Sequence, residues 1–215
     1  MKISLHVCFL GIVLLAPLAH GDALATYVFT GTANGSVGTQ TFTDVTLSVT
    51  GTADTKNIGN GGPFRFNEID FNPGAAILSI GGVGSGIFSD LVFIVDNYGN
   101  GVLLLGGLFG PAASDIVELR DADLGSSVFS TYFLNTSIGP IGPDPDEAVA
   151  AWQNIPTSLG TVTVTSYTDV TFEATVVPEP SSSALLVSGL LLVGVLFRKG
   201  IFRSCTRAFG HSGCP

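Results

Sequence analysis

The central part of the sequence predicts an all-β fold, an antiparallel β-sandwich or jelly roll with one short helix. Three observations support this prediction. The chain of 215 residues contains 28 glycines, which favour turns. Several segments alternate apolar and polar residues, which is typical of half-buried strands. Short apolar runs are separated by regular turn signals, as in sandwiches and jelly rolls.

The alternation is clearest in two segments. Segment 41–50 carries Val45, Leu47 and Val49 between polar residues. Segment 170–176 has an apolar residue at every second position, namely Val170, Phe172, Ala174 and Val176. Because successive side chains of a strand point to opposite faces, we expect each segment to turn one face to the core.

Two shorter runs, 91–95 and 102–105, are apolar throughout, which predicts strands buried on both faces. The segment between them, 97–101, reads Asn-Tyr-Gly-Asn-Gly and predicts a hairpin turn. Further turns are expected at 57–63, 81–86 and 139–143 because Gly, Pro and Asn gather there.

One short helix is expected to begin at Asp144. Asp144 would cap it, Pro145 would take its first position and Glu147 would complete a capping box ahead of the apolar residues 148–152. We expect Trp152 to anchor this helix in the core, and the alternative is a sugar-stacking surface.

The N-terminus predicts a secretory signal peptide, residues 1–25. Lys2 supplies the positive charge, and the apolar stretch 7–16 is shorter than the roughly 20 residues that span a membrane. Two small-residue cleavage sites follow, one ending at Gly21 and the other at Ala25, and the pattern fits both.

The C-terminus combines a stiff spacer, an apolar segment and a basic cluster. Pro178, Glu179 and Pro180 precede the apolar residues 184–197, and Arg198 and Lys199 follow them. Residues 181–197 are barely long enough to span a bilayer as a helix. The basic residues would keep a short tail, 204–215, in the cytoplasm and the preceding domain outside. An ordinary single-pass anchor has the same physical features.

Val-Pro-Glu-Pro-Ser, an apolar span and Arg-Lys together resemble the PEP-CTERM sorting signal of exported bacterial proteins, here at residues 178–203. The resemblance implies that an exosortase acts as the processing partner and removes the C-terminal helix. It implies that Pro178, Glu179, Pro180, Arg198 and Lys199 form the sorting motif. It further implies a role connected with extracellular polysaccharide and biofilm. The chain departs from the family in its tail, which continues beyond the basic cluster.

The region between the two signals, 26–177, is strongly acidic. It holds fifteen carboxylates and three bases, namely Lys56, Arg65 and Arg120. Because such a surface repels phosphate backbones, we expect no nucleic-acid partner.

The same region contains no histidine and no cysteine, since all of them lie in the first 25 residues or after residue 203. This excludes Ser-His and Cys-His nucleophilic sites, typical zinc or copper centres and disulfides within the domain. We therefore predict a domain without catalytic residues, resident metal or other cofactor.

Calcium is the one metal for which the sequence offers ligands. Asp121 with Asp123, and Asp144 with Asp146 and Glu147, could supply oxygen atoms. Their spacing does not match a defined calcium loop, so we favour an acidic loop and a helix cap.

Together these features predict an exported protein of the cell surface or extracellular matrix, tethered to the inner membrane before processing, with a non-catalytic domain at 26–177. The alternative is a secreted carbohydrate-binding module that depends on calcium, which an aromatic cluster on an exposed face would favour. A third, less favoured hypothesis is a glycan hydrolase with two carboxyls about 5–9 Å apart in a cleft.

Overall fold

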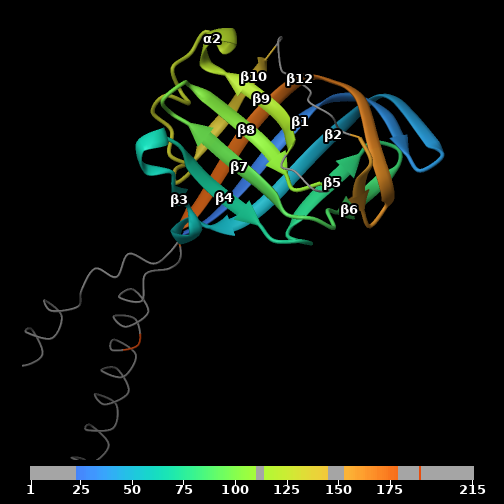
Figure 1. The fold of residues 1–215 in the computed structure, drawn as a ribbon, viewed down its shortest axis with the longest axis horizontal. Coiled ribbons are helices and arrows are strands. Elements are labelled where there is room, and N and C mark those ends of the chain that lie inside the picture. Colours follow the sequence, from blue (N-terminus) through green and yellow to red (C-terminus); the bar gives the residue numbers. More distant parts are fainter. Residues whose placement is uncertain (1–22, 110–113, 145–152, 179–188, 190–215) are drawn as a thin grey trace, which may run out of the picture. The chain divides into compact units, whose positions relative to one another are not determined.

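The computed structural model describes residues 23–109, 114–144, 153–178 and 189, and Figure 1 shows a domain made mostly of β-strands. Asp22–Val177 forms one compact unit. The all-β prediction is confirmed. The expected helix after Asp144, including Trp152, and most of both predicted signals lie outside the described residues. Within the described residues, no helix is both long enough and apolar enough to cross a membrane.

The strands follow one another along the chain with short connections. They are β1 (Ala23–Val37), β2 (Gln40–Asp54), β3 (Gly59–Asn60), β4 (Asn67–Phe71), β5 (Ala76–Ile80), β6 (Gly84–Ile87), β7 (Val92–Asn97), β8 (Val102–Gly107), β9 (Ser114–Arg120), β10 (Ile138–Asp144), β11 (Ile155–Thr157) and β12 (Gly160–Pro178). The helical segments are single turns, η1 (Thr55–Asn57), η2 (Gly62–Phe64) and α2 (Asp121–Leu124).

The strands form two sheets. The seven-stranded sheet has the order β10-β12-β1-β2-β5-β6, with β11 paired to β12. The five-stranded sheet has the order β3-β4-β7-β8-β9. Neighbouring strands for which the register is defined run antiparallel, for example Phe29 opposite Val49 and Ile94 opposite Leu105. This is the sandwich-like arrangement that the alternating pattern predicts.

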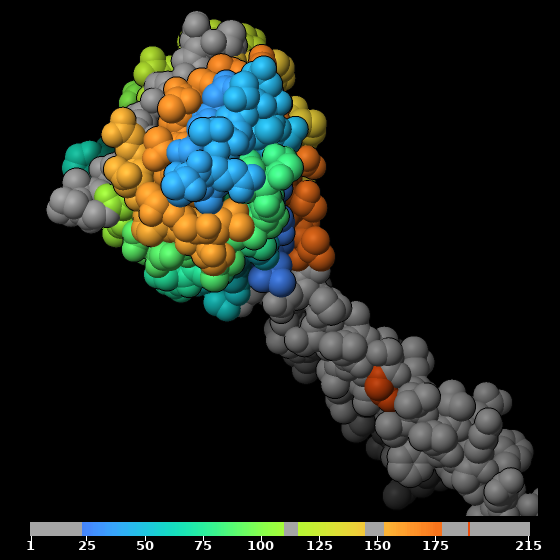
Figure 2. Space-filling model, turned by 90° about the vertical axis from the view of Figure 1, so that its right-hand side faces the viewer, coloured from blue at the N-terminus to red at the C-terminus, as the bar shows by residue number. Residues whose placement is uncertain are grey.

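The larger sheet curls until its edge meets β11. Phe88 forms a bridge with Thr157, and the Ser158 N–H donates to the Ile87 carbonyl at 2.9 Å. Beside this contact, the turn of the β1–β2 hairpin packs on β12 through the Gly38 N–H and the Thr161 carbonyl, 2.8 Å apart. Figure 2 shows this end of the domain, with the blue hairpin next to the orange residues of β11 and β12. The closure covers the open edge of β6.

The core lies between the inner faces of the two sheets. The rings of Tyr27 on β1 and Phe71 on β4 meet edge to face across it, with centroids 6.0 Å apart. Gly51 on β2 lies beneath the same ring, where a Cβ atom would come within 2.5 Å of Phe71. The two sheets therefore approach closely at a position that only glycine fits.

The predicted hairpin at 97–101 is confirmed, because Asn97 pairs with Val102 at the β7–β8 turn. The expectation that its two strands are buried on both faces is wrong. On β7 only Val92, Ile94 and Asp96 are buried, and the residues between them are half exposed. One face of the sheet packs in the core and the other meets solvent, although both faces are apolar in sequence.

Two turn predictions need correction. Residues 139–143 belong to β10, which pairs irregularly with β12. The turn at 81–86 ends earlier, since Gly84 already begins β6. In both cases the neighbouring strand supplies backbone partners that a local Gly and Pro signal does not reveal.

The first and last strands of the domain are neighbours in the larger sheet. The Thr171 hydroxyl donates to the Thr30 carbonyl, and the Thr165 hydroxyl to the Asn34 carbonyl. Because residue numbers rise along β1 while they fall along β12, the start of β1 and the end of β12 lie at the same end of the domain (Figure 1).

Candidate functional site

Three side chains from distant parts of the chain form a cluster on the surface, which we call the aromatic platform: Arg65, Tyr98 and Phe133. The rings of Tyr98 and Phe133 have centroids 5.2 Å apart, tilted by 58°. The guanidinium carbon of Arg65 lies 5.6 Å from the centre of the Tyr98 ring. Phe133 is 45% exposed, so one side of the platform is open to solvent.

Phe133 is held outward by its two neighbours in the chain. Tyr132 and Leu134 are both buried in the core. Leu134 has a left-handed backbone, with φ 60°, and its carbonyl accepts a hydrogen bond from the buried Tyr27 hydroxyl at 2.6 Å. Since a left-handed leucine is strained, these contacts fix a loop that would otherwise relax. The exposed phenylalanine is thus presented by a rigid segment.

Arg65 is fixed in a similar way. It ends η2 with φ 55°, and its N–H donates to the Gly62 carbonyl at 3.1 Å. Its own carbonyl accepts from the Gly99 N–H, next to Tyr98. Among the described residues, Lys56 pairs with Asp54 and Arg120 with Glu118, whereas no carboxylate pairs with Arg65. The Arg65 guanidinium therefore has N–H donors free for a ligand.

A polar hollow of about 300 Å³ lies at β3 and β4. It is lined by Asn57, Gly59, Asn60, Gly61, Phe66, Glu68 and Asp70. The segment Gly61–Phe66 links the two features, because Phe66 lines the hollow and Arg65 belongs to the platform. The Asn, Glu and Asp side chains, after which we call it the polar hollow, can exchange hydrogen bonds with a ligand.

Glu68 and Asp70 point to the same outer face of β4. Partial burial and the neighbouring Asp70 carboxylate, which also shares a hydrogen bond with it, raise the pKa of Glu68. Carboxylates on this face can accept hydrogen bonds from the hydroxyl groups of a ligand.

A second group of polar side chains is buried between the sheets. Asp96 on β7 is fully buried, in register with Asn67 on β4. In the part of the chain that the structure describes, both Asp96 carboxyl oxygens, the Asn67 amide nitrogen and the Tyr132 hydroxyl lack hydrogen-bond partners. Burial and the Asp121 carboxylate raise the pKa of Asp96 to about 8. This group was not predicted, because Asp96 follows an apolar run in which nothing marks it as buried.

Asp121, one of the predicted calcium ligands, begins α2 and is nearly buried. Its carboxylate accepts hydrogen bonds from the Phe129 N–H, the Ser130 N–H and the Ser130 hydroxyl, at 2.7–2.9 Å. These bonds hold the loop that leads to Phe133. No three or more His, Cys, Asp or Glu side chains of the described residues come together as metal ligands.

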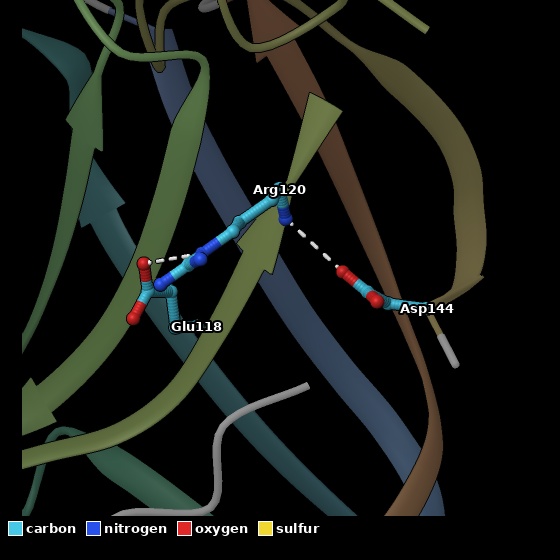
Figure 3. Close-up of polar contacts among 3 residues, drawn as sticks. All are labelled: Glu118, Arg120 and Asp144. Carbon is cyan, nitrogen blue, oxygen red and sulfur yellow. Dashed lines mark hydrogen bonds and ion pairs between the residues drawn. The ribbon is translucent and has the colours of Figure 1, made fainter. Parts of the chain in front are cut away.

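Asp123, the partner of Asp121 in the predicted ligand pair, lies in α2, and Asp144, the described member of the other acidic group, is the last residue of β10. Its carboxylate accepts from the backbone N–H of Arg120 at 3.0 Å, while the Arg120 side chain reaches Glu118 instead (Figure 3). Asp144 and Asp121 are therefore not brought together in one ligand set by these contacts. Asp144 joins the end of β10 to β9, and Asp121 joins α2 to the loop that follows it.

The predicted sorting residues fall at the limit of what the structure describes. Pro178 is the last residue of β12, and Glu179, Pro180, Arg198 and Lys199 lie outside the described residues, as do Asp146 and Glu147.

The aromatic platform was not predicted; from the sequence, Trp152 was the aromatic residue considered for sugar stacking. Phe133 stands between Tyr132 and Leu134 in a segment otherwise rich in Ser, Thr and Asn, and no local pattern marks it as the exposed one of the three. No protein-family model, no curated protein and no solved structure matches this chain.

Proposed function

We propose that the chain is an exported protein of the cell surface or extracellular matrix. An exosortase processes it at the motif Pro178, Glu179, Pro180, Arg198 and Lys199. Its β-sandwich serves a non-catalytic role connected with extracellular polysaccharide. The observation that supports this best is the position of the two domain ends, on neighbouring antiparallel strands. Both signals can then be removed without disturbing the sheets.

The fold also favours one of the two signal cleavage sites. Ala25 is fully buried and pairs with Ala53 near the start of β1. Cleavage after Ala25 would remove Ala23–Ala25 from β1, whereas cleavage after Gly21 would leave the strand whole. We therefore propose Gly21 as the last residue of the signal peptide.

Intact-mass measurement of the protein released from cells tests both ends of the chain. We expect a mature chain that begins at Asp22 and lacks the C-terminal apolar segment 184–197 and the residues after it. Replacement of Arg198 and Lys199 by Glu should weaken retention, because these charges hold the tail on the cytoplasmic side. A released protein that still carries Arg198 and Lys199 would contradict the processing.

The second candidate function is a carbohydrate-binding module, and the aromatic platform is the observation that favours it. Exposed rings offer flat apolar surfaces, and the nearby Arg65 and the polar hollow offer the few hydrogen-bonding groups that orient a ligand. A glycan-array measurement with and without calcium tests this function and its metal dependence. Incubation with polysaccharides from pH 4 to 9, followed by analysis of the products, tests whether the domain is non-catalytic.

A further inference from the structure

We infer that the aromatic platform and the polar hollow form one binding site for a neutral, hydroxyl-rich glycan. A sugar ring stacks on Phe133 and Tyr98, the Arg65 guanidinium donates hydrogen bonds to its oxygens, and Glu68 and Asp70 accept them from hydroxyls of a neighbouring sugar. This inference rests on the proposed connection with polysaccharide, and it names the ligand and the residues.

The protein maintains this surface at a cost in free energy. Phe64 is 75% exposed and Phe133 is 45% exposed, although both are large and apolar. Arg65 and Leu134, next to them in the chain, both have left-handed backbones, with φ of 55° and 60°. Such conformations cost on the order of 1 kcal/mol each and persist where surrounding contacts impose them. Side chains that are already ordered lose little entropy when a ligand binds.

The chemistry of the exposed surface fits a sugar better than a protein. A stable protein interface buries about 800 Å² on each partner around an apolar centre. Here the exposed rings lie beside a guanidinium, and the next residue in the chain, Phe66, lines a hollow that also holds Asn, Glu and Asp side chains. A pyranose has an apolar C–H face and a rim of hydroxyls that both donate and accept. Its chemistry therefore matches rings beside free donors and free acceptors.

The acidic charge of the domain favours a neutral glycan. Glu68 and Asp70 line the hollow, and fifteen carboxylates outnumber three bases between residues 26 and 177. A polyanionic polysaccharide would meet an unfavourable field over most of the domain. A neutral glycan is not repelled by these carboxylates and can still accept hydrogen bonds from Arg65.

The test measures binding of the full-length protein in detergent micelles to laminarin and dextran, which are neutral, and to alginate, which is acidic. Phe133→Ala removes the exposed ring, and Arg65→Gly removes the guanidinium while tolerating the left-handed backbone. Ile87→Ala is the matched control, since Ile87 is also 45% exposed but lies on β6 in the other sheet. Circular dichroism of each variant verifies its fold.

We expect binding to at least one neutral glycan, weakened about tenfold by Phe133→Ala and by Arg65→Gly and unchanged by Ile87→Ala. Glycan binding that is insensitive to both platform variants would overturn the site but leave the polysaccharide function standing. Tighter binding to alginate than to the neutral glycans would overturn the ligand class. Absence of binding to all three would overturn the inference as a whole, while the intact-mass measurement still decides the export and sorting.

Discussion

Asp96→Asn should stabilise the domain, although it replaces a native residue. The Asp96 carboxyl is fully buried beside Asn67, Tyr132 and Asp121, with no positive charge paired to it among the described residues. Its pKa rises from the usual 3.8 to about 8. Folding therefore requires the carboxyl to remain protonated near neutral pH, whereas the unfolded chain ionises freely.

The size of the effect follows from proton linkage. One pKa unit corresponds to about 1.4 kcal/mol, so the shift corresponds to a loss of about 6 kcal/mol of unfolding free energy on complete ionisation. Because the pKa of Asp96 is higher in the folded state, the domain keeps this unfolding free energy in full below about pH 4. It loses the free energy as the pH rises through about 8. The asparagine side chain has no acidic proton to lose, but its buried amide still needs hydrogen-bond partners. We therefore expect the unfolding free energy to rise by a net amount of about 2 kcal/mol at pH 7.

Urea unfolding of residues 23–177, followed by circular dichroism from pH 5 to 9, measures this difference. The gain from Asp96→Asn should grow by about 1.4 kcal/mol per pH unit up to pH 7 and level off above pH 9. Glu173→Gln, on the exposed face of β12, serves as the control and should not show this growth. A variant that is less stable than the native domain at every pH, or a difference that does not depend on pH, would refute the reasoning.

Three further predictions concern the core. Tyr27→Phe should destabilise the domain by about 1–3 kcal/mol, because the buried Leu134 carbonyl loses its 2.6 Å hydrogen bond; urea unfolding measures this loss, and an unchanged midpoint would speak against it. Gly51→Ala should cost about 1–3 kcal/mol because its new methyl group meets the Phe71 ring, and Phe71→Leu should restore part of the loss in the double variant. Thermal unfolding of residues 23–177 should be the same with and without reductant, since this segment contains no cysteine; a lower midpoint with reductant would contradict this.

Local patterns were sufficient to predict four of the strands, β2, β7, β8 and β12. The alternation at 45–49 and 170–176 and the hairpin at 97–101 depend only on the period of a strand and on the backbone freedom of Gly and Asn. The absence of histidine and cysteine from residues 26–177 is a property of composition and needs no structure. The proposed sorting motif is likewise contained in one continuous segment, 178–203.

The candidate site depends on contacts between segments that are far apart in the chain. Arg65, Tyr98 and Phe133 come from three different connections, and their meeting follows from how β4, β7 and the loop after α2 pack. Asp96 resembles a surface carboxylate in sequence, and only the position of the second sheet over β7 buries it and raises its pKa. Strand period tells which side of a sheet a residue faces, but whether that side meets solvent or another layer is decided by tertiary packing.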